Sequence, residues 1–142
     1  MPKMKAVQVP RAGGDLQVVE REIPEAGPGQ VRIRVQACGV CHSDVVTKEG
    51  LFPGISYPRV PGHEVAGTIA QIGPNVKSWS KGDRVGVGWH GGQDGTCLAC
   101  RRGDFGNCAS LKISGISGQE RLQRLSIIPI RTNLTGEAEC RR

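Results

Sequence analysis

One short loop of the chain holds four potential metal ligands, and it constrains the fold more than any other feature. Asp94, Cys97, Cys100 and Cys108 follow one another at intervals of three, three and eight residues. Two cysteines separated by two residues can close a tight turn around zinc, and a carboxylate oxygen is an accepted fourth ligand. The spacing therefore predicts a structural zinc site. A redox-active pair of reduced thiols is the alternative, but it leaves Cys108 unexplained.

A second potential metal site has ligands far apart in the sequence. Cys41 and His63 are 22 residues apart, one just after an expected strand and the other just before one. Catalytic zinc usually takes three protein ligands and keeps a fourth position open, so this pair is incomplete. Each residue also has an ordinary explanation, as a buried thiol or as a histidine that forms its hydrogen bonds within a loop. We expect Cys38 to be a small buried apolar residue.

The residues after Cys41 suggest what such a site does. Zinc lowers the pKa of bound water to about 7, and we expect a bound alcohol to be acidified similarly, so that its carbon can release hydride to a nicotinamide. Ser43 offers a hydroxyl to relay the alcohol's proton, and His42 can pass that proton on or contact a phosphate. Asp44 can hold the second nitrogen of a liganding imidazole. The alternative for Ser43 and Asp44 is a helix N-cap followed by a first-turn acid.

Length, charge and composition exclude several classes of protein. A chain of 142 residues holds one domain with a real core. The net charge of +6 comes from scattered basic residues, and aromatic residues make up 4% of the chain, so we do not expect nucleic-acid binding. The sequence has no apolar run of about 20 residues and no signal-peptide pattern, which predicts no membrane association and a cytoplasmic location.

The pattern of apolar residues and turns predicts a mainly β fold with short helices. Residues 31–35 alternate strictly between apolar and basic, which is typical of a half-buried strand. Further strands are expected at residues 5–9, 16–22, 65–72 and 84–87, with Gly67 allowing a bend or a close backbone approach. Residues 41–49 suit a helix ending at Gly50. Frequent turns favour a small β-barrel, and no GxGxxG motif follows a strand, so we expect no Rossmann domain.

The character of the sequence changes near residue 118. Residues 119–142 are rich in arginine and contain a single glycine and a lone Cys140. The apolar residues of this segment suit a short helix before Pro129: Leu122, Leu125, Ile127 and Ile128. We expect residues 118–142 to be a tail that does not belong to the domain, arising from a frameshift or a truncation.

Four motifs in this order resemble the zinc-dependent alcohol dehydrogenases of the medium-chain dehydrogenase/reductase superfamily. They are Gly-Val-Cys-His-Ser-Asp at 39–44, Pro-Gly-His-Glu-Val-Ala-Gly at 61–67, Gly-Asp-Arg-Val at 82–85, and the cysteine loop at 94–108. The resemblance covers the N-terminal, GroES-like catalytic domain, which we place at residues 1–117. It implies a partly open β-barrel with a structural-zinc lobe.

The resemblance also implies roles for individual residues. Cys41 and His63 would be catalytic zinc ligands, with Glu64 beside the metal as an occasional alternative ligand. Ser43 and His42 would serve the proton relay, and His42 would also contact the cofactor. The loop at 94–108 would be the structural-zinc lobe, although most relatives have cysteine at the position of Asp94. The family's third catalytic ligand and its NAD(P)-binding domain would lie beyond this chain.

The leading functional hypothesis is a portion of an enzyme. The complete protein would oxidise an alcohol, or reduce the aldehyde, with NAD or NADP as hydride carrier, and would be a homo-oligomer like its relatives. We expect this chain to be inactive by itself. The alternative is a non-catalytic zinc-binding module whose intact site is the structural one.

Overall fold

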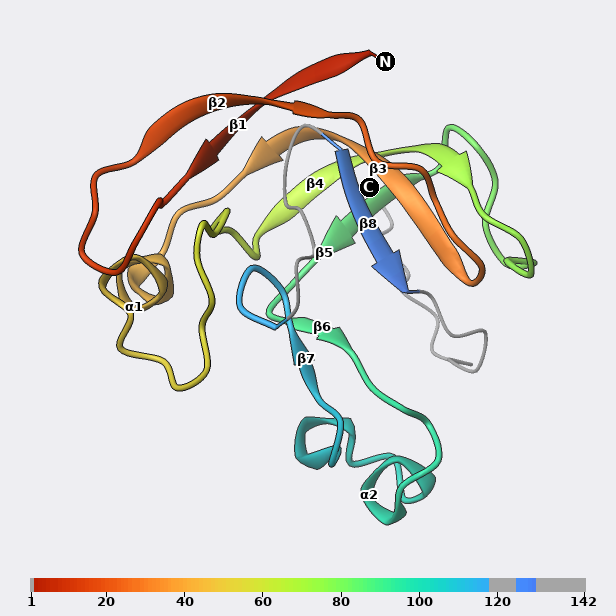
Figure 1. The fold of residues 1–142 in the computed structure, drawn as a ribbon. Coiled ribbons are helices and arrows are strands. Elements are labelled where there is room, and N and C mark those ends of the chain that lie inside the picture. Colours follow the sequence, from red (N-terminus) through yellow and green to blue (C-terminus); the bar gives the residue numbers. More distant parts are fainter. Residues whose placement is uncertain (1, 118–124, 130–142) are drawn as a thin grey trace.

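The computed structural model describes residues 2–117 and 125–129, and its described strands form three antiparallel sheets (Figure 1). The largest has the order β5-β4-β3-β8 and contains β3 (Gln30–Cys38), β4 (Val65–Ile72), β5 (Arg84–Val87) and β8 (Leu125–Pro129). A second sheet pairs β1 (Lys3–Gln8) with β2 (Gln17–Glu22), and a third pairs β6 (His90–Gly92) with β7 (Lys112–Ile113). The helical elements are α1 (His42–Glu49), α2 (Leu98–Arg101) and the 3-10 helix η1 (Phe105–Asn107).

The core lies against the middle of the largest sheet, and strand β3 shows why. Val31 and Ile33 are 0% and 1% exposed, whereas Arg32 is half-buried and Arg34 is exposed. Period-2 alternation therefore places the apolar side chains of β3 in the core, as its sequence predicts. The other buried members of the cluster come from several elements: Ala6, Val60, Val65, Ile69 and Val87. The expected mainly β, partly open GroES-like fold is confirmed, and the described strands do not close into a barrel.

Gly67 marks a point where two strands approach each other closely. A β-carbon at this position would collide with the backbone oxygen of Arg34 and would lie 2.8 Å from Cγ2 of Ile33. The register of β3 against β4 shifts between Val35 and Ala37, next to the pairing of Val35 with Gly67. Of the bend and the close backbone approach expected at Gly67, the close approach is confirmed. The pairing of β4 with β3 also places His63, two residues before β4, near the end of β3.

A separate lobe projects from the main sheets (Figure 1). It begins after β6, contains α2 and η1, and returns through β7, which pairs with β6. Its backbone turns at Gly95 and Gly103, whose φ angles of 70° and 79° favour glycine. The lobe is therefore connected to the rest of the domain through one short two-stranded sheet, and it has little apolar core of its own.

Two expectations from the sequence are wrong. Cys38 is exposed rather than buried, because it is the last residue of β3 and lies beyond the core side chains of that strand. The helix expected before Pro129 is instead strand β8, which pairs with residues Gln30–Arg34 of β3. Leu122 lies outside the described residues. The strand can form here because its hydrogen bonds to β3 are made by backbone groups, which almost any sequence supplies. The domain boundary after residue 117 stays a prediction.

The described part of the chain contains no helix long and apolar enough to cross a membrane.

Candidate functional site

Helix α1 begins at Cys41 and fixes the position of its thiol. Cys41 is the N-cap, and its Sγ accepts a hydrogen bond from the backbone N–H of Ser43 at 3.3 Å. The backbone N–H of Cys41 donates to Oδ2 of Asp44 at 2.9 Å, which completes a capping box. The helix ends at Gly50 in the left-handed conformation (φ 74°), as predicted. The local sequence thus holds the Cys41 sulfur and the Asp44 carboxylate at one helix end.

His63 brings a third group to this helix end from a different part of the chain. The residue is 6% exposed, and its Nε2 lies 3.1 Å from the Sγ of Cys41. Its Nδ1 lies 3.5 Å from Oδ1 of Asp44. The ring of Trp89 packs edge-on against the imidazole, with centroids 5.0 Å apart. Both nitrogens of His63 therefore face residues of the capping box, and the aromatic ring limits the movement of the imidazole.

Cys41 and His63 are suited to hold a zinc ion together. Tetrahedral zinc, with Zn–S near 2.3 Å and Zn–N near 2.0–2.1 Å, separates the two ligand atoms by roughly 3.5 Å, close to the observed 3.1 Å. Oδ1 of Asp44 is buried and has no hydrogen-bond partner among the described residues, so it is available to accept a hydrogen bond from Nδ1–H once His63 binds metal through Nε2. Among the described residues this cluster comprises Cys41, Asp44 and His63. Cys140 lies outside those residues.

The other residues predicted for this site lie around the cluster rather than in it. His42 is exposed at the first position of α1, and Ser43 follows it half-buried. Glu64 is exposed, and its side chain folds against Gly39 rather than toward the cluster. Trp89 was not identified from the sequence. It lies between β5 and β6, and no local pattern indicates that it meets His63.

The lobe gathers the second set of ligands around Asp94. Oδ1 of Asp94 accepts hydrogen bonds from the backbone N–H groups of Thr96 and Cys97, at 2.7 and 2.8 Å. Its Oδ2 lies 3.4 Å from Sγ of Cys108. The bonds from Cys97 and Thr96 hold the pKa of the Asp94 carboxyl well below its ordinary value. One carboxylate oxygen thus shapes the loop, and the other faces the cysteines.

The three cysteines of the lobe lie close enough to share one metal ion with Asp94. Their ligand atoms and a carboxylate oxygen of Asp94 all lie within 4.8 Å of one another. Backbone N–H groups donate to the sulfurs, from Cys100 to Cys97 at 3.5 Å and from Ser110 to Cys108 at 3.3 Å. Burial raises the pKa of the Cys100 thiol to about 12. Three sulfurs, two of which accept N–H bonds, and one carboxylate form a donor set suited to a closed zinc site.

Sequence comparison places these clusters in a known context. The sequence profile of the alcohol dehydrogenase GroES-like domain matches residues 27–131. The chain is 46% identical over 102 residues to alcohol dehydrogenase patD of Aspergillus clavatus, and the matched region covers 72% of this chain and 26% of that protein. It is 37% identical over 133 residues to aldehyde reductase AdhA of Synechocystis, covering 89% and 40% respectively. The chain therefore spans about a quarter to two fifths of the length of the curated relatives it matches.

Comparison with solved structures also finds alcohol dehydrogenases. A cobalt- and zinc-bound thermostable alcohol dehydrogenase from Pyrobaculum aerophilum superposes with a TM-score of 0.82 at 32% identity, over 90% of this chain and 39% of that one. The alcohol dehydrogenase rspB of E. coli, solved with NADH, superposes with a TM-score of 0.80 at 32% identity, over 91% and 37% of the two chains.

Proposed function

The chain belongs to the family of the alcohol dehydrogenase GroES-like domain, and we propose that it supplies the metal-binding part of a zinc-dependent, NAD(P)-linked alcohol dehydrogenase. The substrate is an alcohol, or the corresponding aldehyde or ketone in the reverse direction. Zinc, when bound, supplies Lewis acidity to the substrate oxygen. The observation that carries the proposal is the convergence of Cys41 Sγ and His63 Nε2 at 3.1 Å, with Asp44 at the other imidazole nitrogen.

In this proposal Cys41 and His63 hold the catalytic zinc, and Asp44 positions one of these ligands. A metal-bound imidazole needs its second N–H to face an acceptor, which fixes both the tautomer and the orientation of the ring. The buried Oδ1 of Asp44, which has no other partner within residues 2–117 and 125–129, is that acceptor. The same side chain caps α1 through Oδ2. Asp44 therefore couples the start of the helix to the orientation of His63.

Ser43 and His42 carry the proton away from the substrate. The hydroxyl of Ser43, two positions after Cys41, would accept the proton of the alcohol and release its own proton in the same step. His42, the exposed neighbour of Ser43 in the chain, would take up that released proton and give it to solvent. His42 is also the residue of this set that can contact a cofactor phosphate. Glu64, next to His63 in the chain, serves as an alternative ligand when its side chain leaves Gly39.

The lobe has a structural rather than a chemical role in this proposal. Asp94, Cys97, Cys100 and Cys108 would fill all four positions of a tetrahedral zinc, which leaves none for substrate. The hydride acceptor, NAD or NADP, belongs to the complete protein, because the sequence contains no glycine-rich dinucleotide motif. We therefore expect no alcohol-dependent NADH formation from this chain alone.

Zinc stoichiometry tests the proposal directly. Elemental analysis of the purified chain should find two zinc ions, with one lost on Cys41→Ala and the other lost on Cys108→Ala. Each variant serves as the control for the other, because the two clusters share no residue. Two ions that both survive Cys41→Ala would refute the catalytic assignment.

A non-catalytic zinc-binding module is the second candidate function. The observation that favours it is the contrast between the two clusters. The lobe offers four metal ligands, whereas the other cluster offers only the two ligands Cys41 and His63, because Asp44 faces the second nitrogen of His63. This reading expects one zinc ion, lost on Cys108→Ala and unchanged by Cys41→Ala.

A further inference from the structure

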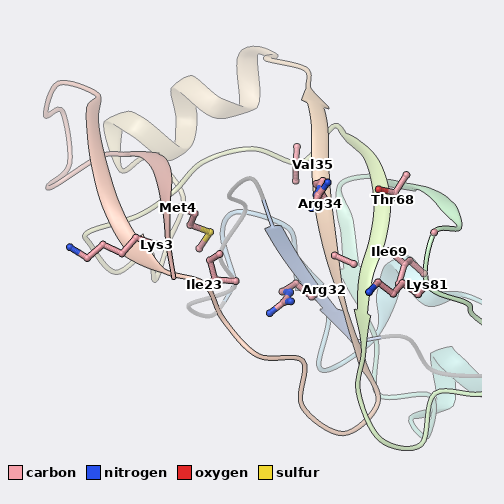
Figure 2. Close-up of a pocket in the computed structure, with 11 residues that line it drawn as sticks. Lys3, Met4, Ile23, Arg32, Arg34, Val35, Thr68, Ile69 and Lys81 are labelled. Carbon is pink, nitrogen blue, oxygen red and sulfur yellow. The ribbon is translucent and has the colours of Figure 1, made fainter. Parts of the chain in front are cut away.

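A large cavity with a cationic lining opens between the β1–β2 sheet and strands β3 and β4 (Figure 2). Its volume is about 760 Å³, and none of its lining residues belongs to the Cys41–Asp44–His63 cluster or to the four-ligand cluster of the lobe. Four basic residues line it, Lys3, Arg32, Arg34 and Lys81, although the amine of Lys3 points away from the others in Figure 2. No acidic residue of the described part lines it. The proposed alcohol chemistry uses none of these residues.

The basic side chains of this cavity are incompletely neutralised. Lys3 pairs with Glu20 at 3.3 Å and Arg32 with Glu25 at 3.4 Å, but both carboxylates are largely exposed. Each of these carboxylates offsets one positive charge, so the net positive charge of the lining comes from the other two basic residues.

Two of the cations have no partner in the part of the chain that the structure describes. Neither Arg34 nor Lys81 makes an ion pair or side-chain hydrogen bond there. Arg32, by contrast, donates through Nη1 to the backbone oxygen of Pro24 at 3.0 Å. Two cations without a carboxylate partner, in a cavity with no acidic lining residue among those described, favour an anionic ligand group.

The rest of the lining is apolar. Met4 and Ile23 lie on one side of the cavity, across from Arg32 of β3, as Figure 2 shows. Val35 and Ile69 add apolar surface from β3 and β4. Met4 and Ile69 are buried, but Ile23 and Val35 are half-buried, and a bare inorganic anion would leave these two partly uncovered. Cavities of about 300–1,000 Å³ that combine apolar walls with a few charged groups are typical of sites for small organic molecules.

We propose that this cavity binds an organic anion made of an apolar body and a phosphate or carboxylate head. The head lies against Arg34 and Lys81, because guanidinium groups bind oxyanions through several directed hydrogen bonds. The body covers the half-buried side chains of Ile23 and Val35. The site is independent of the metal chemistry, so its success or failure in a test leaves the proposed function unchanged.

Calorimetric titration with 1-naphthyl phosphate tests this site on the full, zinc-loaded chain. Inorganic phosphate and 1-naphthol serve as head-only and body-only probes, and each should bind at least about tenfold more weakly than the combined molecule, a difference of about 1.4 kcal/mol. Arg34→Gln and Lys81→Gln should each weaken binding about fivefold or more. Arg11→Gln removes an exposed positive charge outside the cavity and should leave the affinity unchanged.

Three further results decide the proposal. Tight binding of 1-naphthoate with the same dependence on Arg34 supports the site and assigns a carboxylate head. An affinity that falls equally in Arg34→Gln and Arg11→Gln would overturn the proposal, because it would reflect net charge alone. The same holds if neither naphthyl anion binds at millimolar concentration. Circular dichroism and zinc content should be unchanged in each variant. Such a result would show that a loss of affinity does not come from unfolding.

Discussion

Oδ1 of Asp44 lies 3.5 Å from Nδ1 of His63, while Oδ2 of the same carboxylate accepts the backbone N–H of Cys41 at 2.9 Å. One side chain therefore touches both of the residues that we expect to bind the catalytic zinc. The capping bond would form in any helix with an acid at this position. The contact with His63 exists because β4 brings residue 63 to the start of α1.

Substitutions of Asp44 should separate these two roles. Asp44→Asn can still accept the Cys41 N–H, but it presents an amide N–H₂ to Nδ1 and disfavours the tautomer that binds metal through Nε2. We expect zinc affinity at this cluster to fall about 10- to 100-fold with little change in stability. Asp44→Ala should also lose the cap, which costs about 1 kcal/mol. Chelator competition measures the affinity, and urea unfolding of the metal-free chain measures the stability. Equal zinc affinity in wild type and Asp44→Asn would contradict the positioning role.

Asp94 should control how tightly the lobe holds its metal. Asp94→Asn keeps an oxygen that can accept the N–H groups of Thr96 and Cys97, so the loop should keep its shape. It loses the negative charge, and zinc should be released to a chelator at a lower concentration. Asp94→Cys replaces the carboxylate with a softer thiolate and should retain zinc at least as well as wild type. Retention by Asp94→Asn that matches wild type would show that the three cysteines bind zinc without this carboxylate.

Gly67 should tolerate no side chain. Gly67→Ala places a methyl group against the backbone oxygen of Arg34, and neither strand can move without disturbing the core. Overpacking of this kind costs about 1–3 kcal/mol, measurable as a lower urea midpoint. Gly86→Ala is the matched control in the neighbouring strand, because its β-carbon would meet Val65 O at an ordinary 3.7 Å. A Gly67→Ala variant as stable as Gly86→Ala would rule out the close approach.

Cys38 should react slowly with alkylating reagents despite its exposure. Partial burial of the thiol raises its pKa above the ordinary 9.0, and the negative charges of Asp44 and Glu64 add to the increase. Alkylation requires the thiolate, so at pH 8 the rate should be below that of an unperturbed cysteine and should continue to rise above pH 9. Glu64→Gln removes one negative charge and should speed the reaction. Mass spectrometry of the zinc-loaded protein follows this thiol, and a rate that levels off below pH 9 would contradict the raised pKa.

The transcript should reveal how residues 118–142 arose. Reading the codons allowed for residues 119–126 one base out of frame permits asparagine-glycine-tyrosine-serine-aspartate-tyrosine. This is similar to the aspartate-glycine-glycine-tyrosine-alanine-glutamate-tyrosine type of segment that the resemblance to the family implies at this point. We expect sequencing across codons 115–125 to show a shift of reading frame. An uninterrupted in-frame transcript would exclude this origin.

The sequence by itself determined the local features of this protein. The alternation of residues 31–35 predicts which side chains of β3 enter the core, and the run from Cys41 to Gly50 predicts helix α1 with its C-cap. The ligands of the lobe could also be identified together, because they lie within 15 consecutive residues and a single loop can join them. In each case the controlling interactions span a few residues, so local spacing is enough.

The tertiary structure decided the relationships between distant segments. Antiparallel pairing of β3 with β4, permitted by Gly67, places His63 against Cys41 and Asp44, and the turn after β5 places Trp89 against His63. The same packing leaves Cys38 exposed and gathers Arg32, Arg34, Lys3 and Lys81 around one cavity. Such contacts depend on strand register and on which surfaces remain uncovered, and neither is encoded in the spacing of any one segment.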